Sequence, residues 1–83
     1  SPIKRTGRDR FLRNVLIAAG NSGDRSLLPH AEILLADDSP LVRATAVWAL
    51  AQMVTREEFG RLRQLHCPSE SQTVVREEWQ HGD

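Results

Sequence analysis

The chain has 83 residues, which is enough for one small domain, and its 40% apolar and 27% charged residues are typical of a folded globular protein. No apolar run approaches the roughly 20 residues that a membrane helix needs, and no secretory leader is visible. The single cysteine, Cys67, excludes an internal disulfide and a four-cysteine zinc or iron–sulfur site.

The net charge of zero conceals an uneven distribution of charge along the chain. Residues 1–13 carry one acidic residue, Asp9, against the five cations Lys4, Arg5, Arg8, Arg10 and Arg13, which gives a local charge of +4. Residues 14–83 therefore sum to −4. Such an asymmetry is compatible with a merely solvated face of the helix or with an anionic partner for the basic segment, which we favour.

The first predicted helix spans residues 8–19, where six apolar residues form a broad face. Pro2 and Gly7 oppose regular structure, so residues 1–7 are predicted to be a linker from an upstream domain. Asp9 and Arg13 are four residues apart and are expected to pair on the helix surface. Gly20 is a natural residue for the left-handed C-cap.

The second predicted helix follows a turn-forming segment, residues 21–24, and ends near residue 36. Either Asp24 or Ser26 is expected to cap it. Pro29 must lie in or near the first turn, because an interior proline removes a hydrogen bond and costs about 3 kcal/mol. The predicted buried stripe consists of Leu27, Leu28, Ala31, Leu34 and Leu35.

The third predicted helix spans residues 40–54 and starts at the strongest local signal in the chain. Asp37-Asp38 forms a turn, Ser39 caps, and Pro40 occupies the first helical position. Two apolar faces predict a helix packed between layers. One face is Val42, Ala46, Ala49, Leu50 and Met53, and the other is Leu41, Thr45 and Trp48.

Two further helices are predicted in the last third of the chain. Thr55 and Glu58 fit a capping box, which begins a helix that runs to residue 65 and is stopped by Pro68. A short helix over residues 74–80 follows and ends at Gly82. The expected inward residues are Phe59, Leu62 and Leu65 of the fourth helix, with Val75 and Trp79 of the fifth.

The helices recur with a period that predicts an all-α solenoid of helix pairs. Gly20 matches Ala51 at a spacing of 31, whereas Leu12-Arg13 matches Val42-Arg43 at a spacing of 30, and a third copy begins at Val75-Arg76. The predicted domain therefore covers residues 8–83, with repeats at 8–37 and 39–67 and a partial third at 71–81. We expect two stacked helical hairpins plus a short C-terminal helix, whose usual role is to present a surface.

No catalytic or metal site is predicted, and no cofactor is expected in this chain. His30, His66 and His81 are scattered, and the adjacent His66-Cys67 makes a poor metal cage. Cys67 has no base held by a third group, as a catalytic thiol requires. Asp37 and Asp38 are interpreted as turn residues.

Two residues leave alternatives open. Trp48 is either a stacking platform for a ligand or, as we favour, a side chain packed against a neighbouring layer. Arg43 opens the second helix pair and could line one solenoid edge together with Arg13, where helix N-termini favour phosphates. Alternatively it buttresses the inter-repeat turn by pairing with Asp37 or Asp38, which we favour.

The chain resembles a known family in three blocks: residues 1–7 (SPIKRTG), 11–14 (FLRN) and 20–24 (GNSGD). These are similar to the junction and C-terminal HEAT-like segment of bacterial epoxyqueuosine reductase, and residues 39–43 (SPLVR) and 46–50 (AVWAL) resemble its next repeat. The resemblance covers about residues 1–54. One departure is Ala51, which stands where the family has glycine after the Ala-Leu pair.

The resemblance implies a cytoplasmic, monomeric HEAT-like domain that follows an upstream catalytic domain. The family reduces epoxyqueuosine in transfer RNA with a cobalamin and two [4Fe-4S] clusters, whose ligands are absent from this chain. The resemblance therefore implies a non-catalytic domain that contacts tRNA through Lys4, Arg5, Arg8, Arg10, Arg13 and Arg43. The alternative is a HEAT-like module for protein–protein interaction, whose groove would centre on Trp48 or exposed leucines.

Overall fold

The computed structural model describes the backbone of residues 2–81 and the side chains of residues 7–81. Gly82, the predicted end of the last helix, lies outside the described residues. No strand occurs within residues 2–81, which form five α-helices and two short 3₁₀ helices. In chain order these are α1 (Pro2–Ser22), η1 (Arg25–Leu27), α2 (Leu28–Leu34), α3 (Pro40–Met53), α4 (Arg56–His66), η2 (Cys67–Ser69) and α5 (Thr73–His81).

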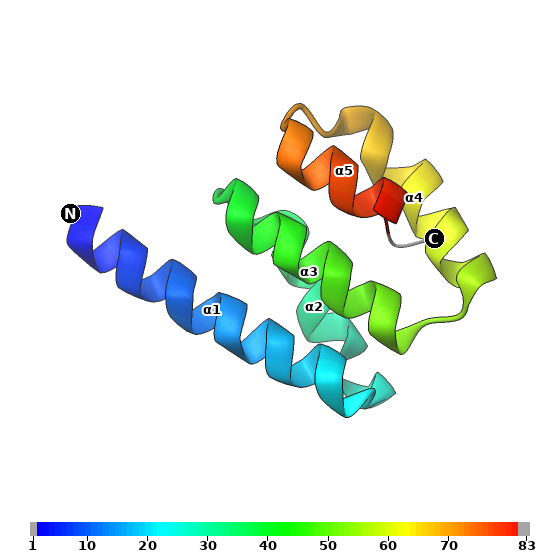
Figure 1. Ribbon diagram of the computed structural model, residues 1–83, viewed down its shortest axis with the longest axis horizontal. Helices are drawn as coiled ribbons and strands as arrows, with labels where there is room; N and C mark the ends of the chain where they lie inside the picture. The colour runs from blue at the N-terminus through cyan, green and yellow to red at the C-terminus, as the bar shows by residue number, and fades with distance from the viewer. Residues whose placement is uncertain (1, 82–83) are drawn as a thin grey trace.

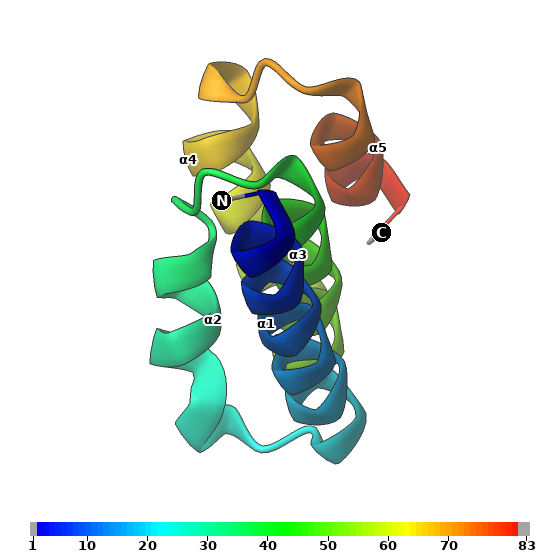
Figure 2. The same cartoon turned by 90° about the vertical axis from the view of Figure 1, so that its left-hand side faces the viewer.

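The helices form two layers. Helices α1, α3 and α5 lie side by side, with α3 in the middle (Figure 1). Helices α2 and α4 form the other layer, and a view turned by 90° places both on the same side (Figure 2). The predicted all-α solenoid of two helical hairpins, α1–α2 and α3–α4, with a short C-terminal helix is therefore confirmed.

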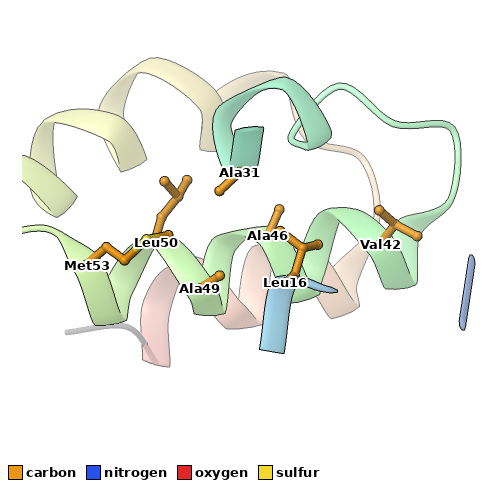
Figure 3. Packing of buried hydrophobic residues seen from close by; sticks show 7 residues of the cluster. All are labelled: Leu16, Ala31, Val42, Ala46, Ala49, Leu50 and Met53. Carbon is orange, nitrogen blue, oxygen red and sulfur yellow. The ribbon is translucent and has the colours of Figure 1, made fainter. Parts of the chain in front are cut away.

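Helix α3 is buried on two faces, as its sequence predicts. Its first face meets Leu16 of α1 and Ala31 of α2, and Figure 3 shows both residues beside the row of α3 side chains. This first cluster contains the predicted residues Val42, Ala46, Ala49, Leu50 and Met53. The second buried face differs from the prediction: it consists of Ala44 and Val47, whereas Leu41 is 51% exposed.

The second cluster joins α3 to α4 and α5, and its largest member is Trp79. This indole is 1% exposed and its ring centroid lies 5.2 Å from that of Phe59. The ring of His66 also stacks on the indole, at a centroid distance of 5.9 Å. Val75 and Cys67 complete the cluster. The predicted inward positions of Phe59, Val75 and Trp79 are thus confirmed.

Helix α1 begins at Pro2, well before its predicted start, so the expectation of irregular backbone over residues 1–7 is wrong for residues 2–7. Proline is tolerated in the first helical turn, where the missing N–H would have no intrahelical partner. Gly7 lies inside a long helix, whose continuous hydrogen bonding outweighs the weak helix propensity of glycine. Whether these residues also link to an upstream domain stays a prediction.

The predicted C-cap of α1 is displaced toward the end of the turn. Gly23, not Gly20, takes the left-handed conformation with φ of 66°, and its N–H donates to the carbonyl of Ala19 at 3.2 Å. Gly20 instead lies inside the helix, where α1 crosses α3. A methyl group at Gly20 would lie 2.5 Å from Cζ3 of Trp48 and 3.2 Å from Cα of Ala49. Gly20 is therefore required for close helix–helix approach.

Replacing Gly20 by alanine is expected to destabilise the fold, although alanine favours a helix by about 1 kcal/mol. The added methyl would overpack the α1–α3 contact, so we expect Gly20→Ala to lower the free energy of unfolding by about 1 to 2 kcal/mol. Urea unfolding followed by circular dichroism measures this. Gly60→Ala is the matched control, because nothing lies within 4 Å of a methyl there, and it should stabilise α4. A stabilised Gly20→Ala variant would contradict the overpacking.

Local signals in the two turns on the α2–α4 side are largely confirmed. Asp24 caps the 3₁₀ helix η1, with its carboxylate accepting from the Ser26 N–H at 2.9 Å, and Pro29 lies in the first turn of α2. The Thr55–Glu58 capping box is present with both hydrogen bonds. A bidentate Arg25 guanidinium and the Thr55 amide hold the pKa of Glu58 at about 2.

One helix boundary and one inward position predicted for this layer are wrong. Helix α2 ends at Leu34 rather than residue 36, because the chain tightens into 3₁₀-type bonds there. The expected inward position of Leu65 is also wrong, because its side chain is 71% exposed.

Candidate nucleic-acid interface

Five of the six predicted site cations belong to α1, and the sixth, Arg43, lies in the first turn of α3. Lys4 and Arg5 fall in the first two turns of α1, and their side chains lie outside the described residues. Arg8, Arg10, Arg13 and Arg43 are described, and the structure separates them into two groups.

Arg8 connects α1 to the turn between the two hairpins. Its guanidinium donates to both carboxylate oxygens of Asp37 and to Oδ1 of Asp9 at 3.1 Å. The hydrogen bond to Asp37 raises the pKa of Arg8 above its ordinary value. Asp37 is itself a turn residue as predicted, because its Oδ2 accepts the N–H of Ser39 at 3.0 Å. Arg8 therefore joins the first helix of one repeat to the turn that starts the next.

Arg43 makes the structural contacts that we favoured from the sequence. Its Nη1 donates to the backbone carbonyls of Asp37 at 2.7 Å and Asp38 at 3.1 Å. Its Nε and Nη2 form a bidentate pair with Glu70, at 2.9 and 3.1 Å. The side chains of Arg43 and Glu70 are only 17% and 10% exposed. All three guanidinium nitrogens thus have intramolecular partners, which leaves little of this cation for a phosphate.

Glu70 is the functional partner that the sequence reasoning missed, and a repeat signal could have found it. Arg76 stands in the third copy where Arg43 stands in the second, and it donates in the same way, to the carbonyls of Cys67 and Glu70 at 2.9 Å each. The same register places Glu70 on Asp37, and the Glu70 carboxylate accepts the N–H of Gln72 just as Asp37 accepts that of Ser39. An acidic residue shortly before an arginine therefore marks each inter-repeat turn.

Arg10 and Arg13 form the other group. Both are exposed, and neither has a hydrogen bond or ion pair within the described part of the chain. The predicted pair between Asp9 and Arg13 does not form, because Asp9 accepts from its neighbour Arg8 instead. The two arginines are three residues apart on one helix, so their side chains project from the same face of α1. Among the cations of this cluster whose side chains are described, Arg10 and Arg13 are therefore the ones that remain available to an external anion.

A shallow groove of about 430 Å³ crosses the layer formed by α1, α3 and α5. Arg13 stands on its α1 side and Glu78 on its α5 side, while Arg43 lines a different hollow. Trp48 is partly buried and packs against the first core cluster, as expected. The apolar groove walls are Ile17, Leu41, Ala44, Trp48 and Val74.

The described residues do not fit an iron–sulfur cluster or a metal. A cluster needs four thiolate or equivalent ligands, and the chain has one cysteine, which is buried in the second core cluster. Among residues 7–81, no group of three histidine, cysteine or acidic side chains is placed to hold a metal ion. Within the described helices, none is long and apolar enough to cross a membrane.

Comparison with known proteins identifies one repeat family and two similar curated proteins. A family model described as HEAT repeat matches residues 27–56, which include α2 and α3. The epoxyqueuosine reductase of Xanthomonas campestris pv. campestris is 47% identical over 53 residues, which cover 63% of this chain. The epoxyqueuosine reductase of Alicycliphilus denitrificans is 42% identical over 59 residues, which cover 61%. No solved structure matches the chain.

These matches confirm the resemblance to epoxyqueuosine reductase and the HEAT-like character of the helix pairs. The aligned segment spans only 15% and 16% of the two curated relatives. Most of the length of those proteins therefore has no counterpart in the matched segment.

Proposed function

We propose that this chain is the non-catalytic, HEAT-like domain of a cytoplasmic, monomeric epoxyqueuosine reductase, and that it helps to hold the tRNA substrate. Similarity at 42–47% identity over about 60% of the chain supports the parent enzyme. The chemistry, including cobalamin and two [4Fe-4S] clusters, is assigned to an upstream catalytic domain, since the residues here offer no ligand set for a cluster.

The observation that carries tRNA contact is the exposed pair Arg10 and Arg13. Phosphate oxygens prefer guanidinium groups that can give two parallel hydrogen bonds, and these two side chains have no competing partner among the described residues. They belong to a segment, residues 1–13, with a net charge of +4. Lys4 and Arg5 extend the charge toward the start of the same helix.

The intramolecular contacts of the arginines support a smaller set of phosphate-binding residues. Arg8 and Arg43 hold the inter-repeat turns, so their removal would disturb the fold as well as any tRNA contact. Arg10 and Arg13 make no contact of that kind. We therefore place the direct phosphate contacts on Arg10 and Arg13, with Arg8 and Arg43 as positioning residues for the surface.

Replacing Arg10 and Arg13 together by glutamine should weaken tRNA binding without changing stability. Binding of the 83-residue chain to a tRNA transcript is expected to be weak, with Kd on the order of 10⁻⁴ to 10⁻⁶ M, because few phosphates are neutralised. Each lost contact should reduce the slope of log K against log salt by about 0.7 to 0.9. Fluorescence anisotropy across a salt titration measures both quantities.

The matched control removes two exposed arginines from the other layer, Arg56→Gln with Arg61→Gln in α4. This variant has the same net charge as the test variant. If both variants lose the same affinity and slope, binding depends on overall charge and not on the α1 surface. If the α1 variant binds as the parent does at every salt concentration, the proposed tRNA contact is wrong.

The groove across α1, α3 and α5 favours a second candidate function, a module for protein–protein interaction. Ile17, Leu41 and Val74 are each at least 40% exposed along its walls. An apolar peptide could insert there, with Arg13 and Glu78 on opposite sides to orient its charges. A Leu41→Ser variant that retains tRNA binding but loses association with a partner protein would favour this reading.

A further inference from the structure

The face of α1 and α2 that points away from α3 is unusually apolar for a surface. Phe11, Val15 and Ile33 are 66%, 45% and 70% exposed. Beside them lies a hollow of about 750 Å³, walled mainly by apolar residues of α1 and α2 and rimmed by Asp24 and His30. We call Phe11, Val15 and Ile33, together with the residues that line this hollow, the α1–α2 face. A contiguous apolar surface of this kind marks an interface.

The repeat register shows what this surface corresponds to inside the molecule. The register that places Gly20 on Ala51 also places Phe11 on Val42 and Val15 on Ala46. Val42 and Ala46 are completely buried, because the α1–α2 hairpin covers that face of α3. In the same register Leu16 falls on Val47, and each is buried against the next helix of its layer.

The α1–α2 face therefore corresponds to the face of α3 that the α1–α2 hairpin covers in the next repeat. We propose that it binds a further pair of antiparallel helices, supplied by the preceding part of the same polypeptide and packed in solenoid register. The proposal rests on the proposed function only in assuming a longer parent protein. The two similar proteins, at 42–47% identity, are much longer, because the matched segment makes up only 15–16% of their length.

A second copy of this chain fits the surface less well than a preceding hairpin. In the register that places Arg43 on Arg76, the residues of α5 that correspond to Ala44 and Val47 are Glu77 and Gln80. Both are exposed, so the last helix has a polar outer side, as a terminal repeat does. Head-to-tail stacking would place those polar groups against the α1–α2 face.

Cysteine labelling in the intact parent protein tests the proposal. A Val15→Cys variant should react rapidly with a maleimide in the 83-residue chain and roughly tenfold or more slowly in the full-length polypeptide. Leu65→Cys is the matched control, because Leu65 is an exposed leucine of α4 outside this face, and its labelling should be equal in both. The native Cys67 is buried and contributes little.

Identification of the covering segment distinguishes the possible occupants. A benzophenone maleimide on Val15→Cys, irradiated in the full-length protein, should cross-link to a segment preceding Ser1 whose apolar residues recur every three to four positions. Equal labelling rates in the two proteins would overturn the proposal, as would cross-links to a non-helical segment. Protection that disappears on dilution would also overturn it, since that identifies a second copy. None of these readouts uses tRNA, so failure of the tRNA proposal is recognised separately.

Discussion

Replacing Trp79 by alanine is expected to lower the free energy of unfolding by about 3 to 5 kcal/mol. The indole is 1% exposed and fills the space between Phe59 and His66, so truncation leaves a cavity in the second cluster. An 83-residue domain has limited stability in total, and a loss of this size approaches the whole of it. Urea unfolding followed by circular dichroism gives the difference.

Val74→Ala on the same helix is the control for this prediction. Val74 is 40% exposed, so its truncation should change the free energy of unfolding by roughly 0.5 kcal/mol or less. If Trp79→Ala unfolds at the same urea concentration as Val74→Ala, then α5 does not contribute to the cooperative core, and the second cluster is smaller than described.

Replacing Arg43 by methionine is expected to destabilise the fold by about 3 kcal/mol. The substitution keeps the aliphatic stem but leaves Glu70 and the carbonyls of Asp37 and Asp38 without their donor in a largely buried site. Lysine should rescue the stability only in part, since an ammonium group cannot form the bidentate pair with Glu70. The measurement is again the free energy of unfolding in urea.

Arg13→Met is the matched control for Arg43, because it removes an equally charged side chain that has no partner within residues 7–81, and it should be nearly neutral. Acidification gives a second check. Burial is the largest single effect and opposes ionisation of Glu70. The hydrogen bond and charge of Arg43, together with the backbone N–H groups of Gln72 and Ser71, outweigh it and hold the pKa of Glu70 below its ordinary value of 4.5. A carboxylate whose pKa is lower in the folded state than in the unfolded state stabilises the fold at pH values above its unfolded pKa. That stabilisation is lost as the pH falls through the folded pKa. The difference between the parent and Arg43→Met should therefore shrink at acidic pH; a constant difference would contradict the ion pair.

Local sequence signals predicted the starts of α3 and α4 well, because caps depend on a few adjacent residues. Thr55 and Glu58 form their capping box, and Pro40 begins α3, although the side chain of Ser39 makes no cap hydrogen bond. Signals that depend on distant packing were less informative. Gly20 was interpreted from its neighbours as a cap, whereas its role comes from Trp48 on a different helix. Leu65 fits an inward stripe, yet its side chain is exposed among the residues that the structure describes.

In the candidate site, too, local features could be predicted from the sequence, whereas features that depend on distant residues could not. The basic character of residues 1–13 was evident from composition, but the separation of Arg8 and Arg43 from Arg10 and Arg13 was not. It depends on carboxylates that are distant in the sequence, in turns whose positions relative to the helices are set by the tertiary fold. Charge alone cannot distinguish an arginine that holds a turn from one that is free for a ligand.

The central position of α3 has a consequence for how the molecule opens. Because α3 contributes residues to both clusters, either end can detach without removing the cluster at the other end. Helix α3 itself cannot unwind unless both clusters dissolve. Its amide protons should therefore exchange with solvent only through global unfolding, whereas those in the N-terminal half of α1 and in the last turn of α5, beyond the buried Trp79, should also exchange through local fraying. Fraying at one end of the chain then leaves the cluster at the other end intact, so that a partner binding at one end need not loosen the other.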